Sequence, residues 1–187
     1  MTAADLSTTA YVILGFLDAR PRTGYEIKHA VDGSTRFFWA ASYGQIYPEL
    51  RRLREARLVT SERDDAGARK RTRHRITADG RRELRRWLAA PAESTELRDE
   101  KLLKLFFTAS VGDEAASRAA GAETLADRAA EHAETAERLR EIEPRVIANG
   151  NPHQLAVLRY GIALNEWGAG HCTRAAGELA EAREETG

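Results

Sequence analysis

Between residues 42 and 59 the sequence predicts an amphipathic helix with a basic outer face. Its apolar side chains recur at helical spacing and form one stripe that faces a core: Ile46, Leu50 and Leu53. Arg51 and Arg52 lie away from that stripe. A helix with positive charge opposite its core contacts is suited to the major groove of DNA.

Alternating arginines follow this helix and predict a basic strand. Arginine occupies every second position from 69 to 75. Successive side chains of a strand point to opposite faces, so these arginines share one face, and His74 and Ile76 belong to the other. Residues 58–63 and 70–76 are expected to pair as a hairpin, with residues 64–67 as its turn. A basic helix followed by a basic ribbon is typical of a winged helix-turn-helix, whose ribbon lies on phosphate.

Charge is distributed unevenly along the 187 residues, although the formal net charge is zero. Residues 1–90 hold 18 Lys and Arg against 11 Asp and Glu, a balance of +7, and the remainder has a balance of −7. A basic first half suits nucleic acid, whereas an acidic second half argues against DNA contact there. The alternative is that the charged runs only form a solvated surface.

Length and apolar content limit the class of protein. The chain is long enough for one large domain or two small ones. Its longest apolar stretch, residues 10–17, is too short to span a bilayer, and we find no secretory signal. Cys172 is the sole cysteine, so no intrachain disulfide forms. These features favour a cytoplasmic protein with no membrane partner.

The start of the basic helix has conflicting signals. Ser42 is a candidate N-cap, and Gln45 three residues later completes a capping box. Pro48 opposes this, because a proline inside a helix loses a backbone hydrogen bond. Either the helix starts nearer Tyr47 or its first turn is irregular.

Three further helices are expected in residues 1–90. The first runs from about residue 6 to 18, the second starts near Thr23, and the third is capped by Thr77 and ends at Pro91. The third carries Leu84, Trp87 and Leu88. The aromatic residues at 37–39 are expected to pack between helices rather than to bind a ligand.

Residues 91–187 have a helical pattern throughout. A densely apolar helix covers residues 102–107, and a long helix starts near Gly112. The long helix has a heptad-like seam, short of the length that proves a coiled coil: Leu125, Ala129, His132, Ala136 and Leu139. After a turn at 149–152, a final helix of about thirty residues is expected.

The final helix has its own seam of residues at steps of three and four. The seam consists of Leu155, Leu158, Ile162, Asn165, Ala169, Cys172, Ala176 and Leu179. Gly168 and Gly170 flank it, which indicates close approach of another helix, and Asn165 is a polar seam residue of the kind that sets register. We expect this interface between two chains, with packing inside one chain as the alternative.

The first ninety residues resemble the PadR family of transcriptional regulators. The matching segments are 11–15 (YVILG), 24–27 (GYEI), 42–48 (SYGQIYP), 50–53 (LRRL), 58–59 (LV), 75–77 (RIT) and Gly80. The helical remainder looks like the longer C-terminal domain of one subgroup by shape and length. The resemblance implies a dimeric winged-helix repressor that a small effector releases from its operator. Many members carry an aromatic pair and a lysine in the second wing strand, where this chain has Thr72, Arg73 and His74.

We therefore expect a mainly α fold with a small β-hairpin: an N-terminal winged helix-turn-helix over residues 1–90 and an α-helical dimerisation and effector domain over residues 91–187. The expected partners are double-stranded DNA with an inverted-repeat operator, a second copy of the chain, and a small aromatic or hydrophobic effector. The predicted DNA-binding residues are Ser42, Tyr43, Gln45, Tyr47, Arg51, Arg52, Lys70, Arg71 and Arg73. The predicted effector-binding residues are Tyr11, Trp39, Trp87, Phe107, Tyr160 and Trp167.

No catalytic site, cofactor site or metal site is expected. The sequence has no glycine-rich phosphate loop after a strand and no nucleophile elbow, and its five histidines lack metal-ligand spacing. Two other functions remain open. One is a metal-responsive regulator that uses His171 and Cys172, and the other is a winged helix that docks a protein through its basic face.

Overall fold

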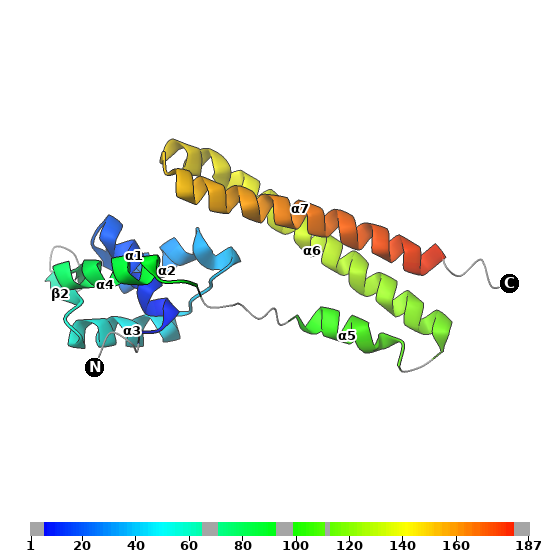
Figure 1. Ribbon diagram of the computed structural model, residues 1–187, viewed down its shortest axis with the longest axis horizontal. Helices are drawn as coiled ribbons and strands as arrows, with labels where there is room; N and C mark the ends of the chain where they lie inside the picture. Colours follow the sequence, from blue (N-terminus) through cyan, green and yellow to red (C-terminus); the bar gives the residue numbers. More distant parts are fainter. Residues whose placement is uncertain (1–5, 65–70, 93–98, 111–112, 182–187) are drawn as a thin grey trace. The chain divides into compact units, whose positions relative to one another are not determined.

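The computed structural model describes residues 6–64, 71–92, 99–110 and 113–181 (Figure 1). The chain divides into two compact units, Met1–Ser94 and Thr95–Gly187. The first unit contains helices and a small sheet, and the described part of the second is helical. A mostly helical fold with a small antiparallel sheet was predicted, and this prediction is confirmed.

The first unit is a helical core with a ribbon at its edge. Its elements are α1 (Thr8–Ala19), β1 (Arg22–Thr23), α2 (Gly24–Asp32), the short 3-10 helix η2 (Thr35–Phe37), α3 (Tyr43–Glu55), β2 (Val59–Asp64), β3 (Arg71–Ile76) and α4 (Ala78–Ala89). Helix α1 packs against α2, α3 and α4. The fully buried side chains come from α1, α2, α3 and β2: Ile13, Leu14, Leu17, Ile27, Val31, Ile46, Leu53 and Val59.

Local signals explain where the helices begin. Thr23 caps α2, since its hydroxyl accepts from the Glu26 N–H and the Glu26 carboxylate accepts from the Thr23 N–H. Helix α3 starts at Tyr43 with Ser42 as N-cap, and the Ser42 N–H donates to Gln45 Oε1 at 2.9 Å. Pro48 therefore lies inside the helix. The alternative start near Tyr47 is wrong.

The sheet has one strand more than the predicted hairpin, in the order β1-β3-β2. The hairpin is antiparallel and places Val59 opposite Ile76, and both side chains are buried. Strand β1 pairs with the other side of β3, with Arg22 opposite His74 and Thr23 opposite Arg73. A two-residue strand has too few side chains to show an alternating pattern.

Two apolar groups of the first unit are less buried than the sequence suggested. The aromatic residues at 37–39 were expected to pack between helices, but Phe38 is 63% exposed and Trp39 is 38% exposed. Phe37 is the last residue of η2, and Phe38 and Trp39 follow it. In the segment between η2 and α3, the buried apolar side chain that joins the core is Ala41. Of the apolar residues predicted on the helix that is now α4, Leu84 is buried and Leu88 is 67% exposed.

The second unit consists of α5 (Glu100–Thr108) and a long hairpin of α6 (Glu114–Ala148) and α7 (Pro152–Glu181). Figure 1 shows α6 and α7 side by side along most of their length, and they form the most extensive contact between two elements. Gly150 in the turn has φ of +67°, a conformation that glycine adopts readily. The predicted α6 seam is confirmed: Leu125, Ala129, Ala136 and Leu139 are buried, and His132 is half-buried.

The seam of α7 packs within the chain, so the expected interface between two chains at this seam is wrong. A Cβ at Gly168 would lie 2.9 Å from the His132 ring, and one at Gly161 would lie 3.2 Å from Leu139 Cδ1. Asn165 Oδ1 lies 2.8 Å from His132 Nδ1, and its amide donates to the Gly161 carbonyl. Gly161, Asn165 and Gly168 of α7 therefore pack against α6.

Candidate nucleic-acid interface

Helix α3 buries one stripe and exposes the predicted reading residues. Ile46, Leu50 and Leu53 are buried, together with Glu49. The exposed side chains include all five candidates on this helix: Tyr43, Gln45, Tyr47, Arg51 and Arg52. Arg52 forms an ion pair with Glu49 at 3.3 Å, whereas Arg51 has no carboxylate partner in the part of the chain that the structure describes.

Two tyrosines give this face a fixed aromatic surface. The rings of Tyr43 and Tyr47 stack with centroids 6.2 Å apart, and Lys28 Nζ lies 5.6 Å from the Tyr43 centroid. Lys28 belongs to α2 and was not predicted as a site residue. Its position four residues before Asp32, to which it donates, is the sequence signal for an ordered side chain.

The first turn of α3 is held by its own polar groups. Because Gln45 Oε1 accepts the Ser42 N–H, the Gln45 side-chain NH₂ points its donors elsewhere. Ser42 and Gln45 are both exposed. A capped helix start with an outward amide is suited to hydrogen bonds with base edges or phosphates.

The arginine face of the wing also contains an acidic residue. Arg71 and Arg75 are exposed, and Arg73 is partly exposed between them. Directly paired residues share a face, and the register pairs Arg73 with the exposed Glu62. The predicted face is therefore less purely basic than the run of arginines indicates. Lys70, another predicted contact, lies outside the described residues.

His74 lies on the inner face of the wing, as predicted. It is half-buried and shares a hydrogen bond of 2.9 Å with the Ser61 hydroxyl. Burial lowers the pKa of His74, and the positive charge of Arg54 lowers it further. The imidazole therefore stays neutral at neutral pH.

Tyr11, a predicted effector residue, contacts neighbouring side chains through its hydroxyl and one face of its ring. It is buried, its hydroxyl donates to Glu83 Oε1 at 2.7 Å, and its ring stacks on Trp87 at 4.7 Å. Burial raises the pKa of Tyr11 to about 12, with the Glu83 hydrogen bond adding to the effect. Glu83 also accepts from Arg86, which lowers the Glu83 pKa. The sequence signal for this cluster was the spacing of Glu83 and Arg86 on one helix face.

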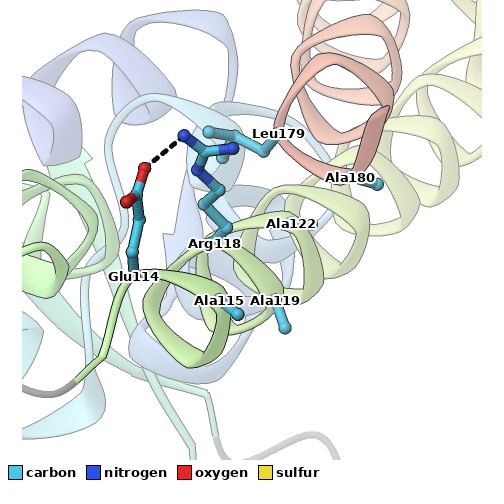
Figure 2. A pocket seen from close by; sticks show the side chains of 7 residues that line it. All are labelled: Glu114, Ala115, Arg118, Ala119, Ala122, Leu179 and Ala180. Atoms are coloured by element: carbon cyan, nitrogen blue, oxygen red, sulfur yellow. Dashed lines mark hydrogen bonds and ion pairs between the residues drawn. The ribbon is translucent and has the colours of Figure 1, made fainter. Parts of the chain in front are cut away.

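The other effector candidates are at least one-third exposed. Trp39 and Trp87 belong to the first unit, and Phe107, Tyr160 and Trp167 belong to the second. None of these five lines the hollow of about 280 Å³ between α6 and α7 that Figure 2 shows. That hollow is lined mainly by alanines, and its cation, Arg118, is paired with Glu114.

His171 and Cys172 do not converge on one site. The His171 ring stacks on Trp167 at 5.0 Å, whereas Cys172 is buried against Leu125 and Ala129. No group of three potential metal ligands occurs among the described residues. Nor does any described helix combine the length and apolar character needed to cross a membrane.

Two family models match consecutive parts of the chain. Residues 13–86 match the transcriptional regulator PadR-like family, and residues 97–180 match the C-terminal region called virulence activator alpha. The first unit of the chain is therefore similar to the PadR-like family of transcriptional regulators. This is a family of regulators and not of enzymes.

Known relatives are similar over different lengths. The negative transcriptional regulator PadR of Bacillus subtilis is 31% identical over 109 residues, which are 57% of this chain and 60% of the relative. A crystal structure of B. subtilis PadR with operator DNA has a TM-score of 0.81 at 22% identity and covers 93% of this chain and 98% of that one. Its structure with p-coumaric acid has a TM-score of 0.74, also at 22% identity, and covers 92% and 99%.

The virulence activator AphA of Vibrio cholerae is a second structural relative. It is 27% identical, has a TM-score of 0.65, and covers 96% of this chain and all of that one. The PadR structures show that this chain has the same fold, and AphA extends the likeness to an activator.

Proposed function

We propose that this chain is a cytoplasmic, sequence-specific DNA-binding repressor whose residues 1–90 bind the operator. The observation that carries the proposal is the outer face of α3, where Tyr43, Tyr47 and Arg51 are exposed on a helix that the core holds in place. Side chains on a rigid helix read base edges in the major groove. Arg71 and Arg75 of the wing then contact phosphate, which adds affinity with little sequence preference.

The relatives support repression and control by a small molecule. The B. subtilis relative is a negative regulator, and its solved complexes contain operator DNA and p-coumaric acid. We infer an aromatic or hydrophobic effector. Its candidate contacts in the first unit are the exposed Trp39 and Trp87, whereas Phe107, Tyr160 and Trp167 of the second unit are also candidates for the interface between two copies of the chain. Such a ligand releases DNA only if it prefers the conformation that binds DNA less well.

A homodimer is proposed through residues 91–187, on a face other than the seam with α6. The exposed apolar side chains of α7 recur at helical spacing: Val157, Tyr160, Leu164 and Trp167. Helix α5 adds Leu103, Phe106 and Phe107, each more than half exposed. Such apolar faces are expected at an interface between subunits. Two-fold symmetry then predicts an inverted-repeat operator.

Selection from a random-sequence duplex library tests the proposal. The full-length protein is expected to enrich duplexes with two inverted half-sites about one helical turn apart, or a multiple of it. Affinity for the enriched duplex should fall steeply as salt rises. If no sequence is enriched and binding is insensitive to salt, the basic face binds something other than DNA, such as an acidic protein.

A further inference from the structure

Arg73 differs from the neighbouring wing arginines because it contacts the connection between α1 and α2. Its Nη1 donates to the Pro21 carbonyl oxygen at 3.4 Å and lies 3.9 Å from Glu26 Oε2. Its Cα partner on β1 is Thr23, the N-cap of α2. The side chains of Arg73 and Glu26 are 39% and 32% exposed, so solvent reaches both. The wing is thus attached to the segment that begins α2.

Glu26 takes part in two contacts at once. Its Oε2 accepts the Thr23 N–H at 2.7 Å, which completes the capping box of α2. This backbone hydrogen bond is the main cause that lowers the Glu26 pKa, and the charge of Arg73 lowers it as well. The carboxylate is therefore ionised at neutral pH. A single oxygen atom connects the start of α2 with strand β3.

Arg71 and Arg75 lie two residues to either side of Arg73 on the same strand. Both are exposed. Arg75 pairs across the hairpin with the neutral Thr60, and the described residues give it no ion pair. Arg75 is therefore the matched comparison for Arg73, with the same charge, strand and face but without the contact to α2.

We propose that Arg73 and Glu26 act as a strut that fixes the wing against the helix-turn-helix. In this arrangement Arg73 is a positioning residue, and it affects DNA binding through the place of the ribbon rather than through a phosphate contact. Helix α2 packs against α3, so a tie between β3 and α2 sets where the wing lies relative to the reading helix. The inference rests on the DNA-binding function proposed above.

The substitution Glu26→Gln distinguishes a strut from a phosphate contact, because the two roles of Arg73 predict opposite changes in DNA affinity. Glutamine keeps an oxygen for the Thr23 N–H, so the capping box is retained. The change also removes a negative charge from the DNA-binding unit. If Arg73 contacts phosphate, its release from Glu26 strengthens binding. If Arg73 is a strut, the wing loosens and binding weakens.

The full-length protein and the duplex that it selects from the random library are used to measure affinity against salt. Arg73→Ala and Glu26→Gln are each expected to weaken binding about fivefold without a change in salt slope, and the double variant should be no weaker than Arg73→Ala. Arg75→Ala should lower the slope by about 0.9 for each lost phosphate contact, and therefore by about 1.8 in a complex of the proposed dimer, which loses two. A slope lowered by Arg73→Ala, or tighter binding by Glu26→Gln, overturns the strut.

Hydrogen exchange of the free protein tests the strut without DNA. Arg73→Ala and Glu26→Gln should both speed exchange of the amides that pair β1 with β3, while Arg75→Ala leaves them unchanged. Unchanged exchange in the first two variants contradicts the strut even if the protein binds DNA. Faster exchange in a protein that selects no duplex keeps the strut and contradicts the DNA-binding function alone.

Discussion

The Tyr47 ring lies directly against Gly24. A Cβ at Gly24 would be 2.7 Å from Tyr47 Cε1, closer than real Cβ atoms approach, and 3.2 Å from its hydroxyl oxygen, tighter than most real contacts. The absence of a side chain at the first residue of α2 therefore leaves space for an aromatic ring of α3. The Tyr47 ring is still 52% exposed, so Gly24 sets the orientation of a candidate DNA contact.

Gly24→Ala should impair DNA binding while leaving the fold stable. The new methyl group displaces the end of an exposed side chain, which moves at little cost, so the free energy of unfolding should stay within about 1 kcal/mol of wild type. Affinity for the selected duplex should fall because Tyr47 and the stacked Tyr43 are displaced together. Urea unfolding and fluorescence anisotropy measure the two effects.

Gly15→Ala is the matched control for this substitution. Gly15 lies in α1 and is exposed, and a Cβ at this position would have nothing within 4 Å of it. Alanine should raise helix stability by up to about 1 kcal/mol and leave DNA binding unchanged. Equal affinity of the Gly24→Ala variant and wild type for the duplex would show that Tyr47 is not a contact.

Gly80→Ala should destabilise the first unit. A Cβ at Gly80 would lie 2.3 Å from the Leu58 carbonyl oxygen and 2.8 Å from Ile76 Cγ1. This carbonyl accepts hydrogen bonds from the Thr77 N–H and hydroxyl, so moving it away from a methyl group would disturb them. We expect the free energy of unfolding to fall by about 1–3 kcal/mol, the usual cost of overpacking. Urea unfolding followed by tryptophan fluorescence measures it. A stability equal to that of wild type would contradict the close approach of α4 to the hairpin.

His74 should make the wing less stable at acidic pH. Its folded pKa lies below the usual value because of burial and the nearby Arg54. The unfolded chain therefore binds a proton first as pH falls, so the stabilisation is complete above the unfolded pKa of about 6.5 and is lost as pH falls toward the folded pKa. Between pH 8 and pH 5, the free energy of unfolding should fall less for His74→Gln than for wild type. An identical pH dependence would place His74 in water.

Leu164→Glu should disrupt the proposed dimer without unfolding α7. Leu164 is 48% exposed and lies between Tyr160 and Trp167 in the apolar face. A buried, unpaired carboxylate at the interface is strongly unfavourable, so sedimentation should detect monomers where wild type is dimeric. Thr173→Glu, an exposed site on another face of α7, is the control. If both variants remain dimeric, the interface lies elsewhere.

Local signals predicted much of the first unit. The Ser42 and Gln45 capping box correctly marked the start of α3, despite Pro48, because a helix tolerates the loss of one backbone hydrogen bond when its core stripe is strong. The alternation of residues in β3 correctly placed Ile76 inside. Both signals act within a few residues, so they are visible in the sequence.

Contacts between distant segments were harder to predict. Small and polar residues on α7 indicated a close helix partner, but the same pattern fits a partner in the same chain, and α6 is that partner. Likewise, the alternation of arginines did not show that Glu62 lies across from Arg73, or that Glu26 reaches it. These contacts depend on which strands and helices pair with one another. The residue pattern within one segment does not show which partner that segment has.

Arg51→Ala provides the most direct test of DNA reading by α3. Arg138→Ala removes an equal charge from an exposed position on α6 and is the control. Affinities are measured for the selected duplex and for a scrambled duplex of equal length. We predict that Arg51→Ala weakens the free energy of binding to the selected duplex by about 1–3 kcal/mol and to the scrambled duplex by much less. Arg138→Ala should bind both duplexes as wild type does. Equal losses on the two duplexes, or no loss by Arg51→Ala, would contradict the assignment of α3 as the reading helix.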